Sequence, residues 1–263
     1  MCRPRSHRAN PTPDVASPNR RMIRIPFLDS QQPEAFPPVN EALSEPDGLL
    51  AAGGDLSPAR LLAAYRLGIF PWYSRGQPIL WWSPDPRTVF DTAHMHVPRR
   101  LARFLRTCDW TLAADTAFET VVRACAAPRA GQRGTWLDPD MRKAYQRLHE
   151  LGHAHSIEAW DGDALAGGIY GVSIGRMFFG ESMFSAADNG SKVALLALAR
   201  ALCGWDYPLL DAQVASPHLF TLGAREIGRS DFSAHVAALT AQRGLEGPWR
   251  DAFPRLAPAE LAT

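Results

Sequence analysis

The sequence predicts a mixed α/β protein in which a small N-terminal domain precedes a larger domain built on a mixed sheet. The second half of the chain shows patterns in the order strand, strand, strand, helix, strand, which favours a parallel pair of strands either side of the helix. The preceding segment 36–87 is dense in Pro, Gly and Trp instead. With 263 residues, the chain is long enough for one large domain or two modest ones.

Composition excludes several classes of protein. Hydrophobic residues make up 46% of the chain and charged residues 21%, which is ordinary for a folded protein and excludes a wholly disordered one. No apolar run approaches the roughly 20 residues that cross a bilayer. The first residues offer arginines and prolines but no apolar stretch, so we expect no secretory signal and a cytoplasmic protein. The four cysteines are scattered, which predicts free thiols and no metal site.

Folded structure is expected to begin near Met22. Residues 1–21 are polar, rich in Pro and Arg, and without periodicity, which is typical of a disordered extension. The small N-terminal domain is expected over 22–86. Its helix begins with Ser57 as the N-cap and Pro58 in the first turn. A group of tryptophans in this domain predicts either a packed minor core or an aromatic recognition surface; its members are Trp72, Trp81 and Trp82.

The larger domain is expected over 87–263 and begins with three helices. Pro98 opens the first, whose arginines are spaced along one face. Asp115 is expected to start the second helix and Asp138 the third. Residues 87–147 carry eleven cations against six acids. This excess indicates either a polyanionic partner or a solvated face.

Strand patterns then replace the helical ones. Alternation predicts three strands, over 156–160, 164–172 and 176–184. Asp161-Gly162 between the first two is a hairpin signal. A helix over 191–203, with Ser191 able to cap it, is apolar almost all round and must therefore be buried. A short strand over 209–214 completes the pattern.

Glu181 lies within an otherwise apolar strand. Strict alternation would place Phe179, Glu181 and Met183 on one face and Ser182 and Phe184 on the other. A carboxylate between Phe and Met costs free energy unless it has a partner. The sequence therefore indicates either a structural salt bridge or a site that receives a cation.

Asp211 and Gln213 end the next strand, two residues apart, so both side chains are expected on one face. Polar groups at the carboxyl end of a buried strand often line a site, and a carboxylate with an amide can orient an amine. The alternative is that Asp211 caps the next turn. Ahead of the buried helix, free backbone N–H groups form a candidate phosphate or carboxylate site. Its residues are Asn189, Ser191 and Lys192.

Several enzyme signatures are missing from the sequence. It contains neither the G-x-x-x-x-G-K-[ST] loop of nucleotide hydrolases nor G-x-G-x-x-G, so a dinucleotide or acyl-CoA pyrophosphate loop is not supported. No G-x-S-x-G and no Cys–His pairing stands out for covalent catalysis.

Longer motifs carry a family resemblance. They are 45–58 (EPDGLLAAGGDLSP), 68–74 (GIFPWYS), 81–87 (WWSPDPR), 134–136 (GTW), 180–185 (GESMFS), Asn189 with Ser191 and Lys192, and 211–213 (DAQ). Taken in order, from about Phe36 to Phe232, they closely resemble the bacterial leucyl/phenylalanyl-tRNA–protein transferases. The resemblance covers some three quarters of the chain, and several long motifs in the right order make chance a poor explanation.

The resemblance implies both a fold and a reaction. The larger domain would have the acetyltransferase (GNAT) fold. The enzyme would take Leu or Phe, and Met less well, from a charged tRNA and transfer it to the α-amino group of a protein beginning with Arg or Lys, which marks that protein for degradation. The expected partners are therefore Leu-tRNA, Phe-tRNA and such acceptor proteins, with no membrane. A monomer that uses neither CoA nor another cofactor is expected.

The implied chemistry suits the residues present. An aminoacyl ester is already activated, and an α-amine has a pKa of about 7.7–8.0, so much of the work is positioning. The family assigns orientation and activation of the amine to the Asp of its D-x-Q motif, which is Asp211 here, aided by Gln213. Whether this Asp is a base or an orienter stays open. Glu181 would help hold the reacting amines.

Matched positions supply the remaining roles. The apolar pocket for the Leu or Phe side chain would be lined by Met183, Leu195, Leu198 and Leu210. Two aromatic residues near the terminal adenosine of the tRNA, where stacking contributes about 1–3 kcal/mol per base, would be Trp72 and Trp136. The cations that meet tRNA phosphates would be Arg99, Arg103 and Arg106.

Two positions depart from the family pattern, and two rival functions remain. Ala212 stands where the D-x-Q motif often has Cys, and Leu198 where some members use Phe, a change expected to widen the pocket. A CoA-dependent N-acetyltransferase predicts an R/Q-x-x-G-x-G/A loop, which residues 185–190 do not supply. A non-catalytic tRNA-binding protein would explain the basic helices and the tryptophans but would leave the polar residues of two strands without a role.

Overall fold

Two sheets organise the part of the chain that the computed structural model describes, residues 25–127 and 137–262. The smaller, N-terminal sheet has the strand order β1-β2-β4-β3, with β1 parallel to β2 and the other pairs antiparallel. Its strands are β1 (Phe27–Leu28), β2 (Leu49–Gly53), β3 (Phe70–Pro71) and β4 (Leu80–Trp82). The helical elements around it are η1 (Val39–Glu41) and α1 (Pro58–Arg66). The extension expected over 1–21 lies outside the described residues.

The larger sheet has seven strands in the order β11-β5-β10-β9-β8-β7-β6. They are β5 (Arg87–Asp91), β6 (Thr111–Ala114), β7 (Ala154–Asp161), β8 (Ala164–Ile174), β9 (Met177–Ser185), β10 (Leu209–Gln213) and β11 (Arg225–Ile227). β9 and β10 run parallel, while the other neighbouring pairs are antiparallel. The predicted mixed sheet, with its parallel pair connected through the buried helix, is therefore confirmed.

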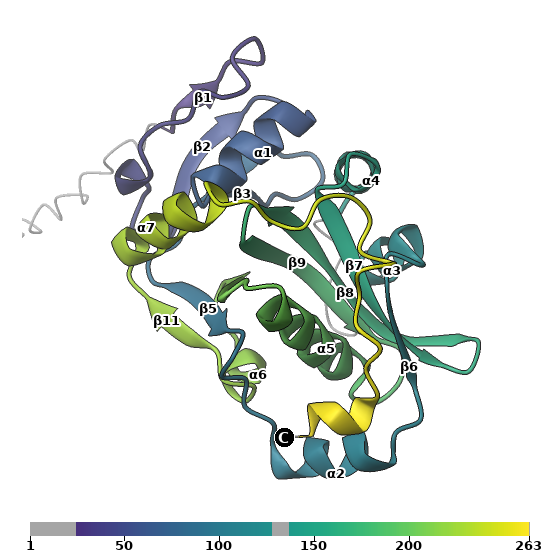
Figure 1. Ribbon diagram of the computed structural model, residues 1–263. Coiled ribbons are helices and arrows are strands. Elements are labelled where there is room, and N and C mark those ends of the chain that lie inside the picture. The colour runs from purple at the N-terminus through teal and green to yellow at the C-terminus, as the bar shows by residue number, and fades with distance from the viewer. Residues whose placement is uncertain (1–24, 128–136, 263) are drawn as a thin grey trace, which may run out of the picture.

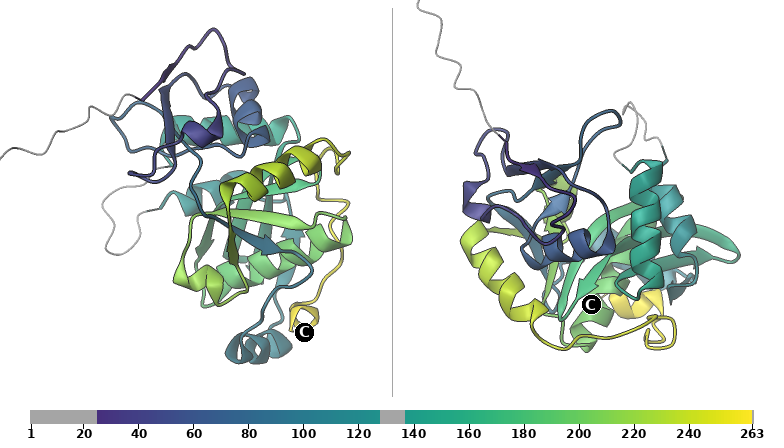
Figure 2. Two further views of the ribbon diagram at one scale, coloured as in Figure 1. Left: turned by 90° about the vertical axis from the view of Figure 1, so that its left-hand side faces the viewer. Right: turned by 90° about the horizontal axis from the view of Figure 1, so that it is seen from above.

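Helices cover both faces of the larger sheet (Figure 1). They are α2 (Arg99–Thr107), α3 (Phe118–Cys125), α4 (Pro139–Glu150), α5 (Gly190–Gly204), α6 (Pro217–Phe220), α7 (Arg229–Thr240) and η2 (Pro258–Leu261). α5 crosses one face, with α2 and η2 beyond it, whereas α3 and α4 pack on the other. Figure 2 shows the N-terminal elements and α7 together at one end of the sheet, where α1 contacts α7. None of the described helices has the length and apolar character that a membrane span needs.

Two hydrophobic cores lie on opposite faces of the larger sheet. One contains buried residues of α1, α3, α4 and α7 together with the N-terminal sheet. The other surrounds α5, whose residues 193–199 are all buried, as its apolar sequence requires. Trp81 belongs to the first core and donates from its indole Nε1 to the carbonyl of Gly53 at 2.9 Å. Trp81 therefore belongs to a packed core, whereas Trp72 is exposed, and a recognition surface there stays a prediction.

The helix starts follow the sequence where a cap and a proline coincide. Ser57 accepts from the backbone N–H of Arg60, and Asp138 does the same for Met141, each with Pro next in the chain. The expected start at Asp115 is wrong, since α3 begins at Phe118 after an N-cap at Ala117. The expected cap at Ser191 is also wrong, because Asn189 holds the N-cap position.

Asp115 does not cap α3, because its side chain is engaged in a network of tertiary hydrogen bonds. Its carboxylate accepts hydrogen bonds from the His155 ring (2.8 Å) and from the backbone N–H groups of Ser156 (2.9 Å) and Trp249 (2.7 Å). Burial acts to raise the pKa of Asp115, but these hydrogen bonds outweigh it and hold the pKa below its usual value. The network ties the C-terminal segment around Trp249 to β7.

Replacing Asp115 by Ala is expected to lower the free energy of unfolding by about 2–4 kcal/mol, because buried donors lose their acceptor. The stability that the wild-type carboxylate contributes is present above the unfolded pKa and is lost as the pH falls through the lower folded pKa. Urea unfolding at pH 7 and at pH 3 measures both effects. The control is Asp161→Ala in the exposed hairpin, expected within about 0.5 kcal/mol of wild type. Equal stability of the two variants would contradict the assigned role.

Candidate active site

A cleft of about 900 Å³ opens where β9 and β10 end beside the last turn of α3, the first turn of α5 and α6. Its walls include Glu181, Gln213 and Ser191, so three regions that the sequence singled out separately meet here. A smaller apolar pocket of about 120 Å³ adjoins it and shares Glu181 with it. Polar groups and an apolar recess therefore lie side by side at the carboxyl end of β10.

A β-bulge aims Glu181 at its partners. In the β8–β9 pairing, Tyr170 lies opposite Ser182 and Gly171 opposite Gly180, so Glu181 is the extra residue. The expectation that Met183 shares a face with Phe179 and Glu181 is wrong, because the bulge reverses the alternation beyond it. Phe179 packs in the core that includes the N-terminal sheet, whereas Met183 packs against the core around α5, on the opposite face.

Three side chains hold the Glu181 carboxyl group. It accepts from the hydroxyl groups of Tyr65 (2.7 Å) and Tyr145 (2.5 Å) and from the side-chain amide of Gln213 (2.7 Å). The two tyrosine oxygens also lie 2.9 Å apart. Neither a basic partner nor a salt bridge is present among these contacts, so the structural salt bridge proposed from the sequence does not form in the described structure.

The tyrosine contacts bear on the protonation of Glu181. The ring formed by Tyr65, Tyr145 and Glu181 has three O···O contacts, but the two phenols supply only two hydrogens, so the full set of hydrogen bonds forms when the carboxyl group holds a proton. Burial raises the pKa of Glu181 to about 7, and the negative charge of Asp211 adds to this effect. The group therefore changes charge close to neutral pH.

Asp211 is placed differently from Glu181. Its side chain is fully buried, and both carboxylate oxygens are engaged by Arg87, with Nε–Oδ1 at 2.8 Å and Nη2–Oδ2 at 2.6 Å. The Gln213 backbone N–H also donates to Oδ1 at 2.9 Å. Asp211 lines the apolar recess but not the larger cleft, to which it is linked through Gln213, whose side chain is directed to Glu181.

Most of the expected pocket residues line the apolar recess. Met183, Leu195 and Leu210 are in its wall, and the sequence missed three further apolar members, Phe90, Ile169 and Leu219. Leu198 does not line it. This residue lies three positions beyond Leu195 on α5 and is fully buried in the core around that helix.

The expected anion site is partly occupied by its own side chains. The Lys192 ammonium donates to the Asn189 side-chain oxygen at 3.0 Å, and the Ser191 N–H donates to the Ser185 hydroxyl at 2.9 Å. Ser191 and His218 reach the cleft wall. Burial lowers the pKa of His218, and the nearby Lys192 charge lowers it further.

Trp72 and Trp136 are the expected partners of an adenosine. Trp72 is 45% exposed and packs against Trp82 with ring centroids 5.8 Å apart. The Trp82 indole donates to the Trp72 backbone carbonyl at 2.6 Å, which fixes the backbone of Trp72. Trp136 lies outside the described residues.

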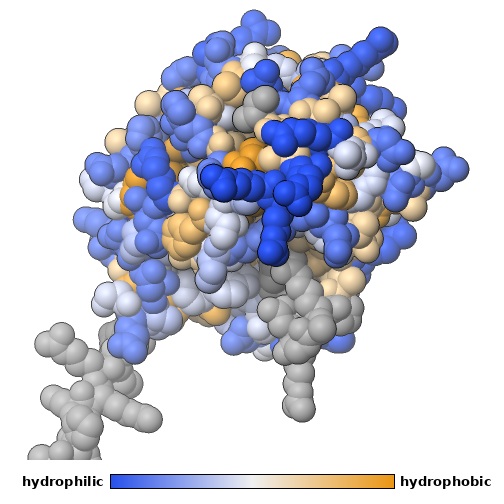
Figure 3. All heavy atoms as spheres, turned by 90° about the horizontal axis from the view of Figure 1, so that it is seen from below, coloured by the Kyte–Doolittle hydropathy of each residue, from blue (hydrophilic) through white to orange (hydrophobic). Residues whose placement is uncertain are grey.

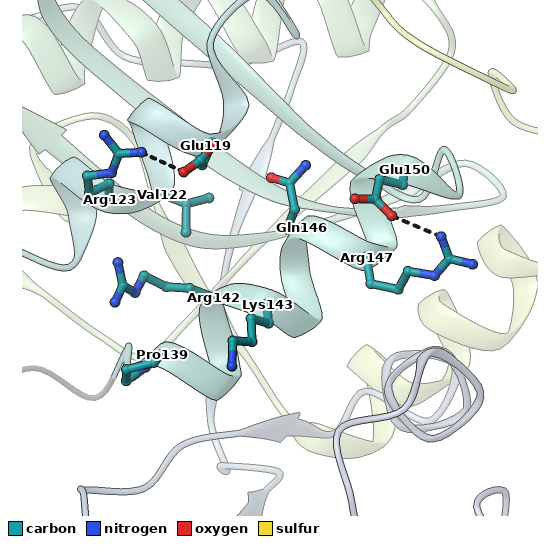
Figure 4. Close-up of a pocket in the computed structure, with 9 residues that line it drawn as sticks. All are labelled: Glu119, Val122, Arg123, Pro139, Arg142, Lys143, Gln146, Arg147 and Glu150. Atoms are coloured by element: carbon teal, nitrogen blue, oxygen red, sulfur yellow. Dashed lines mark hydrogen bonds and ion pairs between the residues drawn. The ribbon is translucent and has the colours of Figure 1, made fainter.

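The basic residues that the structure describes on α2, α3 and α4 lie on two separate surfaces. Arg99, Arg103 and Arg106 are exposed on α2, and none of them forms an ion pair with a described residue. The side of the molecule on which α2 lies shows strongly hydrophilic side chains gathered at its centre (Figure 3). A second basic surface lines a groove of about 490 Å³ between α3 and α4 (Figure 4). There the cations are partly neutralised, by the pairs Arg123–Glu119 and Arg147–Glu150.

The sequence missed Tyr65, Tyr145 and Arg87 as members of the site. Both tyrosines occupy buried positions of helices, where they read as core. Their one signal is that a buried tyrosine needs a partner for its hydroxyl group. Among the described residues, no cluster of His, Cys, Asp and Glu could hold a metal ion.

Known proteins share this chain's sequence along most of its length. Residues 89–237 match the family described as leucyl/phenylalanyl-tRNA protein transferase, and residues 54–85 match its N-terminal domain. A leucyl/phenylalanyl-tRNA–protein transferase of Xanthomonas campestris pv. campestris (strain 8004) is 56% identical over 240 residues, which cover 90% of this chain and 96% of the relative. Proteins of the same name match at 61% identity in Xanthomonas euvesicatoria pv. vesicatoria (strain 85-10), covering 86% and 91% of the two chains, and at 56% in Xylella fastidiosa (strain M23), covering 87% and 95%. With the motifs and the cleft that they build, these matches show that the chain belongs to the leucyl/phenylalanyl-tRNA protein transferase family.

Proposed function

We propose that this protein transfers Leu or Phe, and Met less well, from aminoacyl-tRNA to the α-amino group of proteins that begin with Arg or Lys. The acceptor nitrogen attacks the ester carbonyl carbon, a C–N bond forms, and the C–O bond to the tRNA ribose breaks. The amine gives up a proton, and the ribose hydroxyl group takes one as it leaves. The single observation that carries the proposal is the Glu181 carboxyl group, which faces an open cleft beside an apolar pocket.

The pocket suits an apolar side chain such as that of Leu, Phe or Met. Met183, Leu195 and Leu210 supply apolar wall, while Glu181 stands at the boundary with the cleft, where the α-amino groups would lie. In this arrangement Glu181 and Gln213 form hydrogen bonds with the amines, and Asp211 holds the backbone of Gln213 in place. The residues of the anion site would meet the phosphates near the tRNA terminus; they are Asn189, Ser191 and Lys192.

The proposal also covers the domain organisation, the cofactor requirement, the oligomeric state and the cellular location. A small domain over 22–86 and a transferase domain of the GNAT fold over 87–263 would together form the enzyme. It would work without CoA or another cofactor, as a cytoplasmic monomer, and its products would be directed to degradation. Trp72 and Trp136 would stack on the terminal adenosine.

Transfer of radiolabelled Leu tests the proposal directly. Leu-tRNA is incubated with the protein and an acceptor beginning with Arg, beside the same acceptor beginning with Ala. We expect label on the Arg acceptor alone and none after prior RNase treatment. No label on either acceptor, with tRNA binding intact, would instead support the non-catalytic tRNA-binding protein. Acetylation of the acceptor by acetyl-CoA would support the acetyltransferase.

The unpaired arginines of α2 are proposed to contact the tRNA backbone. Replacing Arg99, Arg103 and Arg106 together by Ala is expected to reduce the slope of log affinity against log salt by about two, because each lost phosphate contact releases about 0.7–0.9 fewer counterions. Filter binding of Leu-tRNA between 50 and 300 mM salt measures this slope. The matched control removes two paired arginines of the other surface, Arg123 and Arg147, and is expected to leave the slope unchanged. A larger effect of the control would place the tRNA across the α3–α4 groove instead.

A further inference from the structure

The Arg87 side chain is held in one orientation by an ion pair and two aromatic rings. Arg87 is the first residue of β5, is fully buried, and forms the bidentate ion pair with Asp211. Its guanidinium lies between two aromatic rings, 4.8 Å from the centroid of Phe70 and 4.5 Å from that of Phe232. These rings belong to the N-terminal sheet and to α7, so three parts of the fold fix one orientation of the Arg87 side chain.

Asp211 connects the fixed Arg87 side chain to the backbone of Gln213. The β5–β10 pairing shifts register between Asp211 and Gln213, and Gln213 takes a left-handed backbone conformation with a φ of 62°. A side chain other than Gly adopts this conformation at a cost and keeps it only where its surroundings enforce it. The enforcing contact here is the hydrogen bond from the Gln213 backbone N–H to the Asp211 carboxylate. The same conformation directs the Gln213 side-chain amide to Glu181.

Asp211 lines the apolar recess but not the larger cleft. Its side chain is fully buried, and both of its oxygens are engaged, by two hydrogen bonds from Arg87 and one from Gln213. An acceptor amine in the cleft would therefore meet Glu181 and Gln213 before it reached Asp211. The carboxyl group that faces the cleft is that of Glu181.

We propose that Arg87 and Asp211 are positioning residues, which act on the reaction by holding Gln213 in the conformation that places its amide against Glu181. The proposal rests on the transfer reaction proposed for this cleft and deepens it. It assigns a function to Arg87, and it places contact with the reacting amines on Glu181 and Gln213.

Arg87→Lys tests the proposal, because Lys keeps the charge but lacks the planar fork that engages both oxygens. We expect kcat for Leu transfer to fall at least tenfold while KM for Leu-tRNA stays within about twofold. Should this variant fail to fold, Phe232→Leu removes one face of the aromatic sandwich and keeps the ion pair. It is expected to give a smaller fall in kcat of the same kind.

Arg60→Lys is the matched control. Arg60 is equally buried, pairs with Asp55 at 3.3 Å and lies 5.7 Å from the Phe36 ring centroid, but it has no contact with Gln213 or Glu181. We expect both Arg60→Lys and Arg87→Lys to lower the melting temperature, and Arg60→Lys to leave kcat at the wild-type value. An equal fall in kcat in both variants would show a merely structural role and overturn the proposal.

The pH profile of kcat gives a readout that a merely structural role would not move. The Gln213 amide hydrogen bond lowers the pKa of the Glu181 carboxyl group, so losing this contact in Arg87→Lys should move the limb near pH 7 to higher pH. Arg60→Lys should leave that limb in place. An unmoved limb in Arg87→Lys would overturn the proposal. Absence of transfer by the wild-type protein in the same assay would instead refute the proposed function.

Discussion

Replacing Glu181 by Gln is expected to lower kcat for Leu transfer by roughly 10²–10⁴-fold, the usual contribution of a group that handles a proton in the transition state. Gln keeps the size of the side chain, accepts a hydrogen bond from one of the two tyrosines and can donate to the other, but it cannot carry the negative charge that an ammonium group requires. Single-turnover transfer from Leu-tRNA to an acceptor beginning with Arg measures the loss.

The pH dependence of the same variant sharpens the prediction. The pKa of Glu181 is raised to about 7, so wild-type activity should rise with pH through this value as the carboxylate forms. In Glu181→Gln only the ionisation of the acceptor amine, at about 7.7–8.0, should remain. An unchanged limb near pH 7 would contradict the assignment.

A second buried glutamate provides the control. Burial also raises the pKa of Glu158 to about 7, but its carboxyl group is bound by Ser156 and Thr116, away from the cleft. Glu158→Gln is therefore expected to keep kcat within about twofold of wild type and to keep the limb near pH 7. A large loss in this variant would show that any change to a buried glutamate disturbs the enzyme.

Ionisation of Glu181 is also expected to lower the free energy of unfolding, and the direction of this effect can be measured. Because the folded pKa lies above the unfolded value of 4.5, the folded state binds more protons between these values, and the free energy of unfolding falls as the pH rises through this range. Glu181→Gln removes this loss and should resist urea better than wild type above pH 7. The site therefore keeps a charge that the fold alone would not favour.

The elements of this fold could be predicted where the signal was local. Ser57 with Pro58 and Asp138 with Pro139 place a cap and a first-turn proline together, and both helices begin there. Asp115 is also a good cap, yet its partners lie about 40 and 134 residues away, so the competing network could not be seen in the sequence. The apolar helix α5 and the parallel strands around it followed from composition and order.

The candidate site was predictable in its members more than in its geometry. Glu181 stood out as a carboxylate in an apolar strand, but its bulge depends on pairing with β8 and has no signature in the strand itself. Arg87 and Asp211 are 124 residues apart, and nothing in either motif indicates that they form a buried pair. The sequence therefore singled out both carboxylates but could not tell which one lines the larger cleft.

Replacing Asp211 by Ala is expected to lower the free energy of unfolding by about 3–5 kcal/mol, because the Arg87 guanidinium is left in the core without its counter-charge. Urea unfolding at pH 7 measures the loss. Asp55→Ala is the comparison, since the Asp55 side chain is 32% exposed, and water can take its place beside Arg60 more readily. A loss no larger than that of Asp55→Ala would contradict the prediction.

Lost transfer in Asp211→Ala alone would thus mix unfolding with catalysis, and a double variant separates them. Arg87→Met with Asp211→Leu replaces both charges by apolar groups of similar volume, which is often neutral or stabilising for a buried ion pair. We expect this protein to regain most of the lost stability and still to transfer Leu poorly, because the Gln213 N–H has no acceptor to hold its left-handed conformation. If stability and transfer returned together, the pair would serve the fold alone, and the chemistry would belong entirely to Glu181 and Gln213.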